Sequence, residues 1–178
     1  MSTMALAGFL SRRRVSLGFV FAVAVLYFSR PTLTSLAAGT AIGAAGEAIR
    51  VWAAGHLEKS REVTTSGPYR FTRHPLYLGS SVMALGAAVA SRSLVVALLM
   101  VLYMGATIAA AIRTEEAFLR RQFGDAYDAY AASRGPLATR RFSVARAWRN
   151  KEYRAVTGFA VFVLLLVGRM WLESAGVI

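Results

Sequence analysis

The sequence predicts an all-α fold: a polytopic membrane bundle of about five transmembrane helices. Hydrophobic residues make up 56% of the 178 residues and charged residues only 17%. Soluble domains typically have about 45–50% apolar residues and about 25% charged residues. The apolar residues fall into five long runs, and the charged residues are clustered between these runs. This pattern indicates that helices cross a lipid bilayer and that the polar chemistry is confined to the connecting segments.

The five apolar runs are expected to form the helices of the bundle. A spanning helix needs about 20 residues, so the first and third runs require flanking residues to reach that length. An arginine cluster at Arg12, Arg13 and Arg14 precedes the first run, but no small-residue cleavage site follows, so this run is expected to be a retained helix and not a signal peptide. The runs cover residues 15–28, 32–49 with a continuation to about 56, 76–90, 94–112 and 155–172.

Short breaks in the apolar pattern predict the turns. Arg30 and Pro31 separate the first helix from the second, and residues 91–93 form a tight hairpin between the third and fourth. Gly39 and Gly43 form a GxxxG step in the second helix. Small residues at this spacing either allow close helix approach or simply reflect a glycine-rich membrane helix.

The charge distribution predicts the orientation. If the N-terminus lies in the cytosol and the helices alternate, 18 of the 21 Lys and Arg residues face the cytosol, and Arg30, Arg92 and Arg169 do not. Basic loops are retained on the cytoplasmic side, so this split predicts the topology. The net charge of +12 is explained in the same way, and no nucleic-acid partner is expected. With no Cys and two His, no metal site is predicted.

The first polar segment on the cytosolic side covers residues 56–78. Residues 66–69 read Ser-Gly-Pro-Tyr, which is typical of a turn. Pro75 suits the first position of the third helix, with His74 at its cap and Tyr77 on the same face. The free N–H groups of this helix start could bind a ligand carboxylate, or the segment could be a capped membrane helix with interfacial anchors.

The second polar segment covers residues 113–130. Glu115 and Glu116 directly follow an apolar helix, where carboxylates require cationic partners. Glu116 and Arg120 form a favourable i, i+4 pair, so the acids could simply belong to a solvated helix with salt bridges. The functional alternative is that one Glu turns inward and holds a cationic ligand group.

Two other patterns have structural explanations. Phe123, Tyr127 and Tyr130 form an aromatic stripe, which is more often packing than a ligand site. Glu47, an intramembrane acid, could be paired with Arg50 three residues later.

Three stretches together carry a family resemblance. They are GEAIRVWAAG from Gly46, TSGPYRFTRHPLYLG ending at Gly79, and EEAFLRRQFGDAYDAY from Glu115 to Tyr130. With them the chain resembles the bacterial branch of the isoprenylcysteine carboxyl methyltransferase family, which is itself similar to phospholipid methyltransferases. The resemblance covers residues 46–134 of a single domain over residues 1–178. Residues 135–178 add a basic amphipathic segment and a C-terminal transmembrane helix.

The resemblance implies a bacterial inner-membrane enzyme with a cytosolic-side cofactor pocket. Such enzymes bind S-adenosyl-L-methionine without a Rossmann domain and release S-adenosyl-L-homocysteine, and no strand followed by GxGxxG is found here. Glu115 would meet the cationic methionine end of the cofactor. The residues implied to bind the cofactor are Arg61, Glu62, Val63, Thr64, Tyr69, His74, Pro75, Leu76, Tyr77 and Glu115.

The acceptor side of the site departs from the family. Ala111 stands where the prenylcysteine enzymes place an Arg that grips the substrate carboxylate, and Arg113 faces another side of the helix. Arg73, Arg113 and Glu116 are candidates for a catalytic role. The expected acceptor is a lipophilic or membrane-embedded molecule, with a lipid or the carboxylate of an isoprenylcysteine-like molecule among the options. The alternatives are a sterol-reductase-like membrane reductase that uses NADPH, or a non-catalytic membrane scaffold.

Overall fold

The computed structural model describes residues 22–176, and every regular element among them is a helix. Residues 22–28, the end of the first apolar run, are helical, whereas the start of that run and the Arg12–Arg14 cluster lie outside the described residues. The all-helical prediction is therefore confirmed for this part of the chain. The elements are α2 (Leu33–Ala54), η1 (Gly67–Arg70), α3 (Pro75–Ser91), α4 (Leu94–Phe123), α5 (Asp125–Ala131), α6 (Val144–Arg149) and α7 (Tyr153–Ser174).

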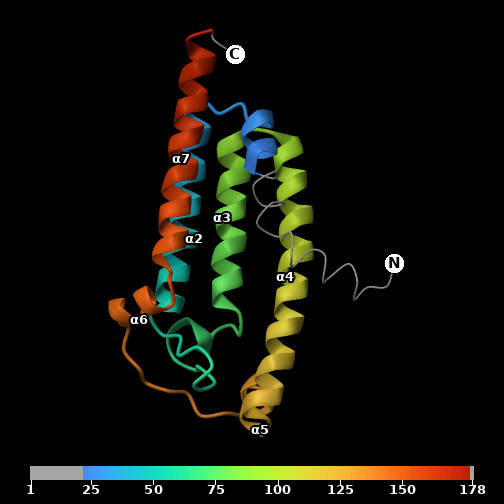
Figure 1. The fold of residues 1–178 in the computed structure, drawn as a ribbon, viewed down its shortest axis with the longest axis vertical. Coiled ribbons are helices and arrows are strands. Elements are labelled where there is room, and N and C mark those ends of the chain that lie inside the picture. The colour runs from blue at the N-terminus through green and yellow to red at the C-terminus, as the bar shows by residue number, and fades with distance from the viewer. Residues whose placement is uncertain (1–21, 177–178) are drawn as a thin grey trace, which may run out of the picture.

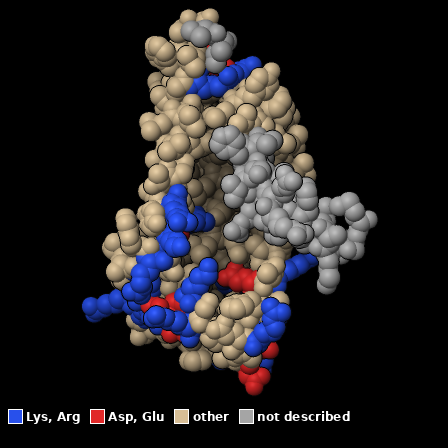
Figure 2. All heavy atoms as spheres, in the orientation of Figure 1, with Lys and Arg blue, Asp and Glu red and all other residues tan. Residues whose placement is uncertain are grey.

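Four long helices form the bundle, and the short elements gather at one of its ends (Figure 1). α2, α3, α4 and α7 run along the long axis, each in the direction opposite to the one before it in the chain. η1, α5 and α6 lie at the end where α2 finishes and α3 begins. We call this end the basic end, since most of the Lys and Arg side chains visible in Figure 2 gather there.

Glycines bring α2 and α3 into backbone contact. A Cβ on Gly46 would lie 2.7 Å from the Gly79 carbonyl oxygen, and a Cβ on Gly86 would lie 2.5 Å from the Gly43 nitrogen. No side chain larger than hydrogen fits at such distances without moving the helices apart. The close helix approach expected from the GxxxG step is therefore confirmed, and α3 is its partner.

The helix ends follow the predicted turn chemistry. Thr32 and Ser35 form a reciprocal capping box at the start of α2. His74 is the N-cap of α3 and Pro75 its first residue, as predicted. Arg92 closes α3 in the left-handed conformation, with φ of 49°, and Ser93 caps α4 by accepting a hydrogen bond from the Val96 N–H. These caps place α3 and α4 as an antiparallel hairpin.

Two helices, α4 and α7, are long and apolar enough to span a membrane, and most of their surface is not covered by protein. Leu102 on α4 and Leu164 on α7 are 70% and 68% exposed, which suits contact with lipid tails. α3 is a shorter apolar helix of 17 residues. The span count of about five stays a prediction.

α4 has 30 residues, so it continues well past the expected run at 94–112. A helix of that length measures about 45 Å, whereas the hydrocarbon core of a bilayer is about 30 Å thick. Its last turns, with Glu115 and Glu116, therefore extend to the basic end. The length of α4 brings these two acids level with the start of α3.

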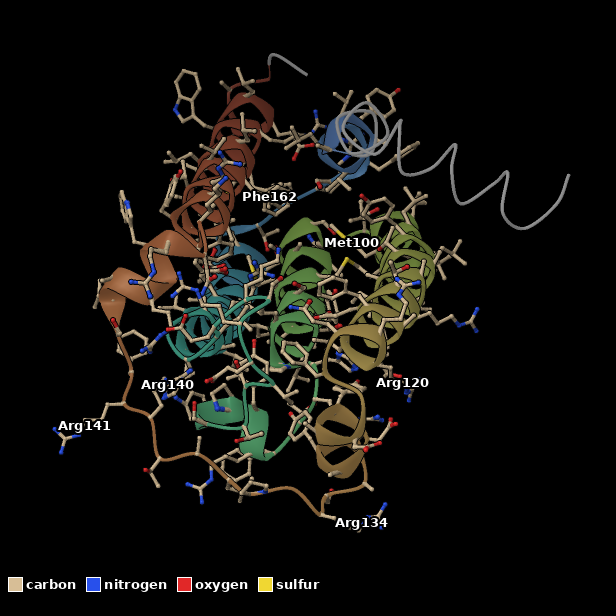
Figure 3. The ribbon with its side chains drawn as sticks, turned by 60° about the horizontal axis from the view of Figure 1, so that its bottom comes forward. Met100, Arg120, Arg134, Arg140, Arg141 and Phe162 are labelled. Carbon is tan, nitrogen blue, oxygen red and sulfur yellow. The ribbon has the colours of Figure 1, made fainter. Side chains whose placement is uncertain are left out.

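The segment after α5 crosses the basic end and returns to the bundle (Figure 1). We call residues 132–152 the clasp. Its Arg140, labelled in Figure 3, pairs with Glu62 at 2.6 Å, and its Arg146 pairs with Glu58 at 2.7 Å. The Ala138 N–H also donates to the Thr65 hydroxyl at 2.9 Å. The clasp thus fixes the long loop between α2 and α3.

Candidate functional site

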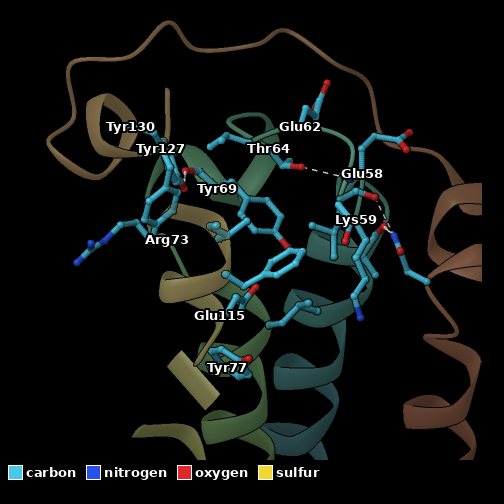
Figure 4. Close-up of a pocket in the computed structure, with 18 of the residues that line it drawn as sticks. Glu58, Lys59, Glu62, Thr64, Tyr69, Arg73, Tyr77, Glu115, Tyr127 and Tyr130 are labelled. Carbon is cyan, nitrogen blue, oxygen red and sulfur yellow. Dashed lines mark hydrogen bonds between the residues drawn. The ribbon is translucent and has the colours of Figure 1, made fainter. Parts of the chain in front are cut away.

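A cavity of about 380 Å³ lies at the basic end, enclosed by the α2–α3 loop, η1, the start of α3, the end of α4, α5 and the end of the clasp. Cavities that bind small molecules have volumes of roughly 300–1,000 Å³. Figure 4 shows that its labelled side chains come from segments far apart in the chain. The folded bundle therefore assembles a site that no single segment contains.

Seven of the ten residues implied to bind the cofactor line this cavity. The other three do not: Arg61 is exposed on the loop, and His74 and Pro75 form the start of α3 outside the cavity wall. The seven are Glu62, Val63, Thr64, Tyr69, Leu76, Tyr77 and Glu115.

The two adjacent acids of α4 face different neighbours. Glu115 lies in the cavity wall next to Tyr77 (Figure 4). Glu116 instead contacts His74, with 3.1 Å between its Oε1 and the His74 Nε2, and also pairs with Arg73 at 3.3 Å. The cavity wall therefore contains Glu115 but not His74, and Tyr77 is the residue of the α3 start that lies beside Glu115. Cofactor binding by His74 and Glu115 stays a prediction.

The aromatic part of the cavity wall consists of Phe118 and four tyrosines, namely Tyr69, Tyr77, Tyr127 and Tyr130. The Tyr130 hydroxyl donates a hydrogen bond of 2.8 Å to the Tyr69 carbonyl oxygen, so η1 and α5 are held together. Burial raises the pKa of Tyr69 well above its ordinary value and the pKa of Tyr130 to about 12. These hydroxyls stay protonated at physiological pH and can donate hydrogen bonds.

The loop carries two further acids into the cavity wall, Glu58 and Glu62. The Arg146 guanidinium, hydrogen-bonded to Glu58, holds the pKa of that carboxyl below its usual range, so Glu58 remains ionised. The Thr64 hydroxyl accepts a hydrogen bond from the Glu58 N–H at 3.2 Å, drawn as a dashed line in Figure 4. The clasp therefore sets the position of the acidic side of the cavity.

The polar residues of the cavity wall that were not predicted to belong to the site include Arg50, Asn150 and Glu152, besides Glu58, Lys59 and Ser60 of the loop. Arg50 pairs with Glu152 at 2.8 Å, which is closer than its 3.8 Å approach to Glu47, the partner expected from the sequence. The Asn150 amide donates to the carbonyl oxygens of Ala54 and Leu57, both at 2.9 Å. Glu152 is an acid directly before the last apolar run, inside a strongly basic segment. That position was the signal available in the sequence.

Of the three catalytic candidates, only Arg73 lines the cavity. Arg113 is exposed on α4, and Glu116 is engaged with His74 and Arg73 outside the cavity wall. A catalytic role for any of the three stays a prediction.

A second cavity, of about 450 Å³, is an apolar groove between α3, α4 and α7. Figure 3 labels Met100 on α4 and Phe162 on α7, which belong to its two sides. Its wall also contains two polar residues, Arg50 and Ser80. Arg50 lies in the walls of both cavities, so it marks the place where the groove and the polar cavity meet.

Comparison with known proteins identifies a family. The model of the family described as phospholipid methyltransferase matches residues 19–126. This match includes α2, the α2–α3 loop, α3 and nearly all of α4, and these segments together contain most of the residues that line the cavity. No solved structure matches the chain at a comparable level of significance.

Three curated proteins are similar to parts of the chain. A cobalt-zinc-cadmium resistance protein CzcN of Cupriavidus metallidurans is 33% identical over 67% of this chain and 61% of its own length. A nickel-cobalt-cadmium resistance protein NccN of Alcaligenes xylosoxydans xylosoxydans is 35% identical over 55% of this chain and 46% of its own.

The third relative is an enzyme by name, the protein-S-isoprenylcysteine O-methyltransferase of Schizosaccharomyces pombe. It is 35% identical over 48% of this chain and 36% of its own length. The chain thus spans between 36% and 61% of the lengths of these relatives.

Proposed function

Since the chain belongs to the phospholipid methyltransferase family, we propose that it is a membrane methyltransferase that binds S-adenosyl-L-methionine at its basic end and methylates a lipophilic acceptor. The observation that carries the proposal is the cavity in which Tyr77 and Glu115, both implied by the family motifs, lie side by side. The similarity to an isoprenylcysteine O-methyltransferase supports the same chemistry.

The cavity suits the chemistry of S-adenosyl-L-methionine. Its wall holds the carboxylates of Glu58, Glu62 and Glu115, which favour a ligand with an ammonium group and a sulfonium. Lys59 and Arg73 in the same wall can pair with a ligand carboxylate. The rings of Tyr69 and Tyr127 offer flat apolar surfaces for a purine base.

When bound, S-adenosyl-L-methionine supplies a methyl group on a positively charged sulfur. The residues of the chain then mainly orient the reactants and exclude water. Glu115 would hold the cationic end of the ligand, and the clasp holds Glu62 and Glu58 of the cavity wall through Arg140 and Arg146. The apolar groove between α4 and α7 gives a lipophilic acceptor a route to Arg50 from the side of the bundle.

The size of the cavity separates this proposal from an NADPH-dependent reductase. At about 380 Å³ it lies near the lower end of the range for small-molecule sites, which favours a single nucleoside over a dinucleotide. The basic residues around it also suit the cytosolic side of a bacterial inner membrane, where the nucleoside is available.

Calorimetry with the detergent-solubilised protein and S-adenosyl-L-homocysteine tests the proposal. The wild type should bind with a Kd in roughly the micromolar range, as enzyme ligands commonly do. Glu115→Ala should weaken binding by about tenfold or more, because it removes the partner of the cationic ligand group.

Glu173→Ala is the matched control, since Glu173 is ion-paired with Arg30 and Arg169 at the opposite end of the bundle. It should leave the affinity unchanged. Binding of NADPH, or equal affinities for the wild type and Glu115→Ala, would contradict the proposed function.

A further inference from the structure

The border between the polar cavity and the apolar groove is a buried cluster of charged residues. Arg50 reaches both sides of it: its guanidinium donates to the carbonyl oxygen of Leu76, in the cavity wall, and to the hydroxyl of Ser80, in the groove wall. Glu152, the last residue of the clasp and the N-cap of α7, lies 2.8 Å from the Arg50 Nη2. We call Glu47, Arg50 and Glu152 the junction.

Acid is in excess at the junction. Two carboxylates share one guanidinium, with Arg50 3.8 Å from Glu47 and 2.8 Å from Glu152. Both acids are over nine-tenths buried, at 7% and 6% exposure. Neither oxygen of Glu47 accepts a hydrogen bond from the described residues, nor does the Glu152 Oε1, despite its ion pair. Buried carboxylates are costly when their hydrogen-bonding capacity is unused, so Glu152, which faces the cavity, is free to contact a ligand group.

We propose that Glu152 is the acceptor-facing catalytic residue of this chain, held by Arg50, and that it takes the proton from the nucleophile of an acceptor whose apolar chain lies in the groove. This inference rests on the proposed methyltransferase function and adds the residues and the charge preference of the acceptor side. The acceptor is a single apolar chain that ends in a nucleophile still carrying its proton.

The step balances in protons and electrons. The Glu152 carboxylate accepts the proton of the nucleophile, whose freed lone pair forms the new bond to the methyl carbon. The bond between that carbon and sulfur breaks, and its electron pair stays on sulfur, so the positive sulfonium becomes a neutral thioether. Glu152 then releases its proton to solvent through the cavity at the basic end.

The same charges select against a carboxylate acceptor. An anionic head group at the junction would meet two buried carboxylates, and like charges in a poorly solvated site repel strongly. Arg50 does not offset this repulsion, because its guanidinium is already paired with Glu152.

Photo-crosslinking tests the head-group preference without the cofactor. The protein is placed in phosphatidylcholine nanodiscs with dodecyl probes that carry a mid-chain diazirine and an amine, thiol or carboxylate head. The wild type should crosslink the amine and thiol probes on peptides of α4 and α7, and the carboxylate probe about tenfold less. Glu152→Gln should raise the yield with the carboxylate probe by about tenfold and lower the yield with the amine probe, because one negative charge is removed.

Methyl transfer from tritium-labelled S-adenosyl-L-methionine to dodecylamine or dodecanethiol provides the second readout. Glu152→Gln should lose about 10²- to 10⁴-fold in rate, the usual contribution of a general base, while its Kd for S-adenosyl-L-homocysteine changes less than about threefold. Arg50→Lys keeps the charge but not the planar contacts, so it should keep the head-group preference and lose about tenfold in rate.

Two further variants keep the test decisive. Glu173→Gln, at the opposite end, should change neither readout. Glu152→Asp retains the charge and replaces Glu152→Gln in the test if that variant does not fold. It should keep the wild-type probe preference and have a reduced rate of methyl transfer.

An unchanged head-group preference and rate in Glu152→Gln would overturn the inference. So would a wild type that prefers the carboxylate probe, or one that binds S-adenosyl-L-homocysteine but methylates neither dodecylamine nor dodecanethiol. A wild type that selects the amine probe but does not bind S-adenosyl-L-homocysteine would instead overturn the proposed function.

Discussion

Glu115 and Glu116 are neighbours in the chain, but they serve different parts of the molecule. Successive residues of a helix point about 100° apart, so one acid can face the cavity while the other faces the start of α3. Glu116 pairs with Arg73 and His74 and ties α4 to α3. Glu115 remains available to a ligand in the cavity. The order of the two acids thus separates a structural role from a binding role.

Glu58 makes the clasp sensitive to acid. Its folded pKa is depressed by the hydrogen bond from Arg146, so the ionised form is stabilised by folding. This contribution is present above the ordinary carboxyl pKa of about 4.3 and is lost as the pH falls through the lowered folded value. Glu58→Gln should therefore lower Tm at pH 7 by on the order of 2–4 °C, the effect of about 1 kcal/mol in a chain of this length.

Thermal denaturation in detergent checks this expectation. The two proteins should differ at pH 7 and converge as the pH falls below the lowered folded pKa of Glu58, where the wild-type carboxyl is protonated as well. A difference in Tm that stays constant across this pH range would show that Glu58 does not act through its charge.

At the scale of helices, the contact between α2 and α3 sets the geometry of the site. The α2 backbone at Gly43 and Gly46 contacts Gly86 and Gly79 of α3 with no side chain between them, whereas a Cβ on Gly43 would point at Phe159 of α7. This close packing brings Arg50, near the end of α2, within reach of Leu76 and its carbonyl oxygen. The glycines therefore help to form the junction, although none of them lines the cavity.

Gly86→Leu should destabilise the protein severely, because a Cβ at this position would lie 2.5 Å from the Gly43 nitrogen. Overpacking a well-packed contact costs about 1–3 kcal/mol even for smaller insertions, and here the obstacle is rigid backbone. Gly105→Leu on α4 is the matched control, since nothing lies within 4 Å of its Cβ position.

Thermal stability in detergent, read by tryptophan fluorescence or by size exclusion after heating, compares the two variants. The control should stay within about 0.5 kcal/mol of the wild type. Equal stabilities for both variants would mean that α2 and α3 do not pack through these glycines.

On the scale of the whole molecule, charge and lipophilicity are separated along the bundle. The Lys and Arg side chains gather at the basic end (Figure 2), while α4 and α7 expose apolar side chains along their length. A basic end is retained in the cytosol, and an apolar exterior requires lipid. Together they predict that the polar cavity lies at the cytosolic boundary of the membrane.

Single-cysteine labelling tests this orientation cleanly, because the chain contains no Cys. Thr139→Cys lies on the clasp and Ser174→Cys at the end of α7, and both positions are exposed. In intact bacterial cells, a membrane-impermeant maleimide should label the Cys at 174 and should reach the Cys at 139 only after lysis. The reverse pattern would show that the basic end faces outward.

The helical class, the approximate positions of the long helices and seven of the cofactor candidates in the cavity wall follow from the sequence alone. Apolar periodicity, caps and turn residues act over a few positions, so His74, Pro75 and Ser93 could be placed without any tertiary information. The family motifs likewise predicted Tyr77 and Glu115 as site residues, and both line the cavity. The phospholipid methyltransferase match supports that resemblance.

Which side chains meet across the bundle depends on the tertiary packing of the helices. Glu152 follows Arg50 by about a hundred residues, and the two come together because the clasp returns the chain to the end of α2. The same packing directs His74 toward Glu116 and away from the cavity. Local sequence patterns carry no information about such contacts, because the contacts depend on how helices far apart in the chain are placed by their combined packing.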